Sequence, residues 1–166
     1  MSMLDRLSTK SLIIVAALAS ASILVGAFIF QSLGYAPCKM CLWQRWPHAI
    51  AIALGGAALA TKMRVLRWVG ALNMAVSAGL GIYHSGVERK LWEGPSSCTG
   101  GGVGNLSVDD LLAQIQAAPL IRCDEIPWRL SDMIPIEALD ITMANFNAIG
   151  SLVFMALWIV AARRAD

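Results

Sequence analysis

Two cysteines separated by two residues, Cys38 and Cys41, occur in the segment PCKMCLWQRWPH, residues 37–48. A Cys-x-x-Cys pair can be an exchangeable dithiol, half of a zinc site or a haem attachment point. Haem attachment requires a histidine directly after the second cysteine, and Leu42 stands there instead. Because a two-residue ring removes little chain entropy yet keeps a disulfide exchangeable, the spacing favours redox chemistry. Inert structural disulfides are the main alternative.

A cation follows this pair at helical spacing. Arg45 lies four residues after Cys41, and His48 lies seven after it, so a helix beginning here places all three near one face. Free N–H groups at a helix start favour an anion. These features lower a thiol pKa and predict Cys41 as the better thiolate, although Arg45 could instead be an interfacial anchor. Pro47 cannot donate to the carbonyl of Trp43, which predicts an irregular first turn that opens a pocket.

The other two cysteines, Cys98 and Cys123, are separated by 24 residues and form no second Cys-x-x-Cys motif. A structural zinc site built from thiolates is typically made of two close pairs, so no metal is expected. Cys98 lies in EGPSSCTGGGVG, residues 93–104, and this Gly, Ser and Pro content predicts a mobile loop.

The elements that must position these residues follow from the distribution of charge. Of the 166 residues, 57% are hydrophobic and only 14% are charged, against about 25% charged in a soluble domain. A spanning helix needs about 20 apolar residues, and four regions come close to this length without a charge. The sequence predicts an all-α membrane protein, a four-helix transmembrane bundle forming a single integral membrane domain (residues 1–166), with spans at residues 12–33, 43–61, 66–87 and 142–162.

The first apolar run could instead be a signal peptide. Arg6 and Lys10 form a basic start, and Ala19-Ser20-Ala21 resembles a cleavage site. However, the run continues past Phe30 and is long enough to span a membrane. A retained first span is therefore the prediction.

Orientation follows from the positive flanks, which stay in the cytoplasm. With four spans, seven Lys and Arg residues share one side: Arg6, Lys10, Lys62, Arg64, Arg67, Arg163 and Arg164. The other side receives residues 34–42 and 88–141, which contain all four cysteines. Between Glu88 and Met143 there are nine acids and four bases. Both termini are therefore expected in the cytoplasm, with the cysteines in a compartment that supports disulfides, which in a bacterium is the periplasm.

The long outward segment is expected to carry short amphipathic helices. In SVDDLLAQIQAA, Ser107 and Asp110 form a predicted capping box, and the apolar side of the helix is formed by Leu111, Leu112, Ile115 and Ala118. A second stretch, residues 126–139, mixes apolar and charged side chains. It is expected in the headgroup region, with packing onto a small external core as the alternative.

In combination, these features resemble the DsbB family of bacterial inner-membrane thiol oxidases. The resemblance covers nearly the whole chain. It includes the span pattern, PCKMC followed by QRWP in residues 37–47, YHSG from Tyr83, Cys98 in a Pro/Ser loop, and CDEIPW from Cys123. The periplasm is kept oxidising by this DsbA–DsbB–quinone route.

The resemblance implies roles for matching residues. Cys38 and Cys41 would be the membrane-proximal pair, with Cys41 passing electrons to ubiquinone or menaquinone from the membrane pool. Arg45 would stabilise negative charge on the quinone oxygen, and His84 resembles a histidine near the quinone pocket. Cys98 would form the mixed disulfide with a DsbA-like partner, and Cys123 would then exchange with Cys38. No nucleic-acid partner is expected.

Three other interpretations remain open. His48 and His84 lie at the same predicted side of the membrane and could bind a b-type haem between helices. The protein could be a non-enzymatic membrane protein with disulfide-stapled outer loops. It could also be another quinone enzyme with four helices and a Cys-x-x-Cys pair, such as vitamin K epoxide reductase, although that family has its pair nearer the end of the chain.

Overall fold

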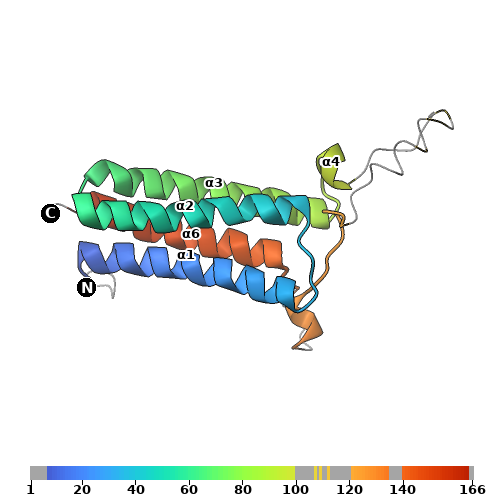
Figure 1. The fold of residues 1–166 in the computed structure, drawn as a ribbon, viewed down its shortest axis with the longest axis horizontal. Helices are drawn as coiled ribbons and strands as arrows, with labels where there is room; N and C mark the ends of the chain where they lie inside the picture. The colour runs from blue at the N-terminus through green and yellow to red at the C-terminus, as the bar shows by residue number, and fades with distance from the viewer. Residues whose placement is uncertain are drawn as a thin grey trace.

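The computed structural model describes residues 7–99, 107, 109, 112, 121–134 and 140–164. Four long helices lie side by side in it (Figure 1). They are α1 (Thr9–Ser32), α2 (Lys39–Thr61), α3 (Arg64–Glu88) and α6 (Met143–Arg163). Two short elements, α4 (Ser96–Thr99) and the 3-10 helix η2 (Leu130–Asp132), lie in the connection between α3 and α6. The long helices occupy nearly the same residues as the four predicted spans. The start of α1 and the end of α6 lie at the same end of the bundle (Figure 1).

Local side-chain chemistry explains where these helices begin and end. The hydroxyl oxygen of Ser8 accepts the backbone N–H of Ser11 at 3.1 Å and so caps α1. Thr142 caps α6 through a reciprocal pair of hydrogen bonds with Asn145. At the end of α2, Lys62 adopts a left-handed conformation with φ of 59°, and α3 begins two residues later. Because this connection is short, α2 and α3 pack against each other as an antiparallel hairpin.

The helices pack in a ring, in which α1 and α3 each contact both α2 and α6. Small residues allow close approach at two of these contacts. A Cβ added to Gly55 would lie 2.7 Å from the Cβ of Ala17 on α1, and one added to Gly81 would lie 2.8 Å from the backbone nitrogen of Ala148 on α6. Small residues thus bring α2 close to α1 and α3 close to α6.

The outer surface of the bundle is apolar, as expected for contact with lipid. Leu18 is 62% exposed and Leu72 is 67% exposed, whereas Trp158 in the core is fully buried. Three helices, α1, α3 and α6, are long and apolar enough to cross a membrane. The first two turns of α2 carry Lys39, Gln44 and Arg45, and α2 is not among the three.

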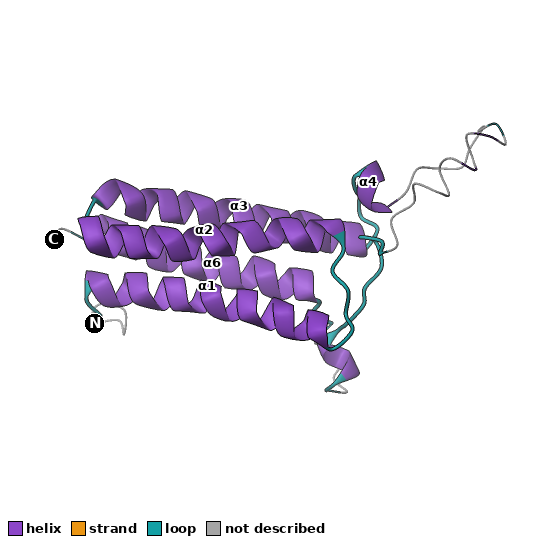
Figure 2. Cartoon of the chain, in the orientation of Figure 1, coloured by secondary structure: helices purple, strands orange, loops and turns teal. Residues whose placement is uncertain are grey.

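The connection between α3 and α6 is only partly described. The predicted helix of residues 107–118 falls almost wholly outside the described residues, including Asp110, Leu111, Ile115 and Ala118. In the stretch 126–139, the described part contains one 3-10 turn, drawn as helix in Figure 2. Arg129 forms an isolated bridge with Thr142. Trp128 is 8% exposed, and its ring centroid lies 5.3 Å from that of Phe30 and 6.1 Å from that of Phe146. The beginning of this stretch therefore packs onto the end of the bundle.

Candidate functional site

All four cysteines gather at the end of the bundle opposite the termini. Cys38 precedes α2, Cys41 lies in its first turn, and Cys98 lies in α4. Cys98 and Cys123 form a disulfide with a Cα–Cα distance of 5.4 Å, and the N–H of Cys123 donates to the carbonyl of Cys98 at 3.0 Å. Cys38 and Cys41 are free thiols. The molecule thus presents one bonded pair and one reduced pair.

The position of Cys98 differs from the expectation of a mobile loop. Its side chain is fully buried, as is that of Cys123. Both sulfurs belong to a cluster with Cys38, Met40 and Val87. With the disulfide formed, packing against this cluster favours the buried position over an exposed one.

Cys38 occupies the N-cap of α2, and this position controls the acidity of the pair. Its sulfur accepts the N–H of Cys41 at 3.2 Å, and the two sulfurs lie 3.0 Å apart. A hydrogen bond from the Cys41 thiol, opposed by burial and helped by His84, lowers the pKa of Cys38 to about 4. The expectation that Cys41 is the better thiolate is therefore wrong for this state. The helix begins at Lys39, earlier than the predicted span, so its free N–H groups serve Cys38.

His84 links the two pairs. A ring nitrogen of His84 and the sulfurs of Cys38 and Cys123 all lie within 4.8 Å of one another. These are donor types that could hold a metal, but the sulfur of Cys123 is committed to a disulfide and offers no thiolate. The geometry instead suits sulfur exchange, because Cys38 and Cys123 need little movement to meet.

A cavity of about 520 Å³ opens beside the reduced pair. Its wall contains three residues assigned to cofactor binding from the sequence, Cys41, Arg45 and His84, together with His48 and Trp128. The remaining lining is mostly apolar and comes from α1, α2, α6 and the segments before α2 and η2: Ile23, Leu24, Gly26, Ala27, Phe30, Tyr35, Ala36, Pro37, Gln44, Pro127, Met143, Ala144, Phe146, Asn147, Ile149 and Gly150. Such a lining suits an apolar ligand with a few polar atoms.

Arg45 crosses from α2 to α1 along this cavity. Its Nη1 donates to Oε1 of Gln31 at 2.8 Å, and its Nη2 donates to the carbonyl of Ala27 at 3.3 Å. The guanidinium carbon lies 4.8 Å from the ring centroid of Phe28. Its Nε is buried without a hydrogen-bond partner among the described residues. A cation on the cavity wall thus retains one unused donor.

His48 is also buried, at 1% exposure. Its Nε2 lies 2.8 Å from Oδ1 of Asn147, whose Nδ2 donates to the carbonyl of Ser77 at 3.2 Å. Within the described part of the chain, its Nδ1 has no partner. Both histidines engage their Nε2 atoms with protein groups, since that of His84 faces Cys38 at 3.5 Å. This arrangement does not favour a haem held between His48 and His84.

Sequence reasoning missed four residues that support this site. Gln44 contacts His84, Glu88 lies one turn after His84, Asn147 contacts His48, and Trp128 lines the cavity. Of these, the i, i+4 spacing of Glu88 from His84 was a usable signal. The others depend on how separate helices face one another, which sequence spacing does not reveal.

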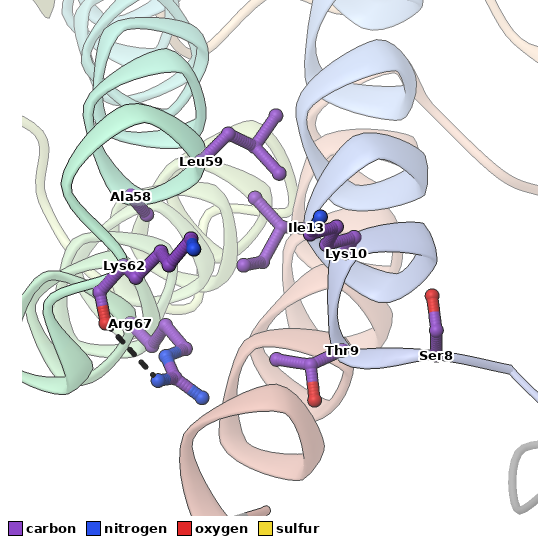
Figure 3. A pocket seen from close by; sticks show the side chains of 8 residues that line it. All are labelled: Ser8, Thr9, Lys10, Ile13, Ala58, Leu59, Lys62 and Arg67. Carbon is purple, nitrogen blue, oxygen red and sulfur yellow. Dashed lines mark hydrogen bonds between the residues drawn. The ribbon is translucent and has the colours of Figure 1, made fainter. Parts of the chain in front are cut away.

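A second cavity, of about 370 Å³, lies at the other end of the bundle (Figure 3). Its lining includes the cationic residues Lys10, Lys62 and Arg67 and contains no cysteine or histidine. Arg67 is fully engaged there, because its guanidinium donates to the carbonyls of Ala161 at 2.9 Å and Lys62 at 3.4 Å. This second cavity therefore has no side chain for thiol–disulfide chemistry in its lining.

A helical membrane protein with a reduced Cys-x-x-Cys pair beside a buried disulfide belongs to the class of thiol–disulfide redox proteins. The family model described as disulfide bond formation protein DsbB matches residues 9–161. The chain therefore belongs to the DsbB family, as its sequence pattern predicted, and is a membrane oxidoreductase of disulfide formation. Comparisons with curated proteins and with solved structures give no match.

Proposed function

We propose that this protein is a thiol:quinone oxidoreductase of the bacterial inner membrane that reoxidises a periplasmic, DsbA-like dithiol oxidase. It forms a single integral membrane domain in which all four long helices cross the bilayer. Although α2 is not among the helices marked as spans by length and composition, it has 23 residues and packs between α1 and α3. Positive flanks support cytoplasmic termini, which leaves the cysteines facing the periplasm.

Electrons enter at the bonded pair. A thiolate of the reduced partner attacks Cys98, the Cys98–Cys123 bond breaks, and Cys123 leaves as a thiolate. The second partner thiol then displaces Cys98 and releases the oxidised partner. Cys123 attacks Cys38 of an oxidised Cys38–Cys41 pair, and Cys41 leaves as a thiolate. The Cys98 thiolate then attacks Cys123, which re-forms the Cys98–Cys123 disulfide and releases Cys38, so that both sulfurs of the Cys38–Cys41 pair are reduced. The proximity of Cys38 and Cys123, within 4.8 Å at sulfur, supports this order.

Electrons leave through the cavity beside Cys41. The residues there fit a quinone, because the lining is largely apolar and two buried polar atoms, Nε of Arg45 and Nδ1 of His48, have no partner in the described part of the chain. A bound ubiquinone or menaquinone supplies an acceptor for two electrons and two protons. Cys41 would face its ring, Arg45 would stabilise negative charge on a ring oxygen, and His84 would line the same pocket.

The observation that carries this proposal is one reduced pair in which Cys41 lies on a cavity wall and the sulfur of Cys38 lies within 4.8 Å of that of Cys123 in the disulfide. An inert disulfide staple has no need of the second pair at that distance. Purified protein should be mixed with a reduced thioredoxin-fold oxidase and a short-chain quinone, while quinone absorbance and free thiols are followed together. One quinone should be reduced for each pair of partner thiols lost. Thiol loss without quinone reduction would contradict the proposal.

Orientation is tested separately in intact cells. A membrane-impermeant maleimide should label single-cysteine variants that retain Cys98 or Cys38 once the outer membrane is permeabilised. Cysteines introduced at Lys62 or Arg163 should react only after the inner membrane is opened. The reverse pattern would place the sulfurs in the cytoplasm and exclude a periplasmic partner.

A further inference from the structure

The ring of His84 is held on one side by the side-chain amide of Gln44. The amide nitrogen of Gln44 lies 2.7 Å from Nδ1 of His84 and 3.4 Å from the carbonyl oxygen of Met40. That carbonyl can only accept a hydrogen bond, so it fixes the NH₂ group on this side of the amide. The other N–H of the same group then points at Nδ1. Gln44 is 7% exposed and His84 is 2% exposed, so water does not compete for this contact.

The tautomer of His84 follows from this contact. A nitrogen that accepts from an amide cannot carry its own proton, so the proton of the neutral ring sits on Nε2. Nε2 lies 3.5 Å from the sulfur of Cys38 and 3.9 Å from Oε1 of Glu88. The N–H of His84 is therefore directed to the point where the reduced pair approaches Cys123.

Glu88 lies near the other ring nitrogen of His84, Nε2. Its carboxylate is buried, and its Oε2 accepts the hydroxyl of Thr142, the N-cap of α6, at 2.6 Å. This bond positions Oε1 beside the imidazole. Among the described residues, the titratable groups facing Cys38 are thus Cys41 on α2 and His84 and Glu88 on α3. The sulfurs of Cys98 and Cys123 also pack there, but they are bonded to each other and do not titrate. The α6 contribution is the uncharged Thr142.

We propose that Gln44 is a positioning residue that selects the Nε2–H tautomer of His84, so that His84 acts as a hydrogen-bond donor to the Cys38 thiolate. While the Gln44 amide points at Nδ1, the ring cannot take a second proton there without losing that bond. His84 therefore stabilises the anionic sulfur by donation and does not act as its base. The assignment of Cys38 to the electron path rests on the proposed function, whereas the tautomer does not.

The tautomer can be read directly in the full-length protein in detergent micelles, without quinone or partner. The chain has only two histidines, so selective ¹⁵N-histidine labelling gives two rings, which His48→Phe assigns. In the wild type, Nε2 of His84 should carry the proton and Nδ1 should not. In Gln44→Glu, a carboxylate replaces the amide donor, so Nδ1 should become protonated. A wild-type ring protonated on Nδ1 would overturn the proposal even if no variant folded.

Reactivity of Cys38 provides the second measurement. Its alkylation rate is followed against pH by mass spectrometry in the wild type, Gln44→Leu and the control Asn73→Leu. Asn73 also bridges α3 to α2, through the carbonyl of Pro47 at 2.7 Å, but does not contact His84. Gln44→Leu should shift the midpoint of the alkylation profile upward by about one pH unit, which lowers the alkylation rate about tenfold at pH values well below the wild-type midpoint, and Asn73→Leu should not shift it. If Gln44→Leu and Gln44→Glu both retain the wild-type tautomer and pH profile, Gln44 has no positioning role. Because neither measurement uses quinone or partner, that failure would leave the proposed function standing.

Discussion

The two cysteine pairs are held in different ways. Cys38 and Cys41 share one turn at the start of a long helix, where a backbone N–H and the ring of His84 meet the sulfur of Cys38. Cys98 and Cys123 come from segments 25 residues apart and are bonded to each other. The helix start stabilises a thiolate, whereas the loop pair is held by its bond and by burial. We infer that Cys38 and Cys41, the helical pair, hold the electrons in a reduced form stabilised as a thiolate. Cys98 and Cys123, the loop pair, exchange disulfides with the partner.

The largest effect should come from removing the sulfur on the cavity wall. Cys41→Ser should abolish quinone reduction, because Cys38 would have no second sulfur with which to form a disulfide. Mixed-disulfide formation between Cys98 and the partner should remain, and it can be trapped and seen on a non-reducing gel. Quinone reduction at the wild-type rate would show that the helical pair is not the electron donor.

Cys98→Ser should abolish oxidation of the partner and leave quinone reduction by the helical pair intact. The partner would no longer be oxidised or trapped, because the sulfur that it attacks is missing. The helical pair is untouched by this change, so quinone reduction driven by dithiothreitol should continue. A variant that still oxidises the partner would show that electrons can enter directly at Cys38 or Cys41, which would remove the division of roles between the two pairs.

The acidity of Cys38 sharpens the comparison. Because its pKa is lowered from the ordinary 9.0 to about 4, the thiolate is present above about pH 4 and is lost as the pH falls through this value. Alkylation of Cys38 in the wild type should therefore be nearly constant between about pH 8 and pH 5. An ordinary thiol would react about a thousandfold below its plateau at pH 6, and such a profile would contradict the N-cap argument.

The smallest of these effects is expected at Arg45. Arg45→Ala should raise the KM for quinone by about tenfold, the size of one lost charged hydrogen bond, while turnover at saturation is largely retained. Arg64→Ala is the matched control, since Arg64 donates to the carbonyl of Ala162 at the other end of the bundle. Equal kinetics in Arg45→Ala and the wild type would show that Arg45 only anchors α2 to α1.

Much of the fold could be predicted from charge alone. Uninterrupted apolar runs located the four long helices, since a buried or lipid-facing helix does not tolerate a bare charge. The start of α2 was missed by four residues, because Lys39 is compatible with either a loop or a first helical turn. That small difference decided which cysteine caps the helix, and it reversed the expected order of thiol acidity.

The sequence by itself determined that the four cysteines would meet at one end of a four-helix bundle. They lie in the connection between the first and second helices and in the connection between the third and fourth, and two passes through the bundle return the chain to the same end. Only the tertiary structure decided which sulfur faces which group. The contacts of Gln44 with His84, of Glu88 with Thr142 and of Cys38 with Cys123 depend on the rotation of neighbouring helices about their axes. That rotation is set by the combined packing of many small side chains, such as Gly55 against Ala17, and no local spacing in the chain encodes it.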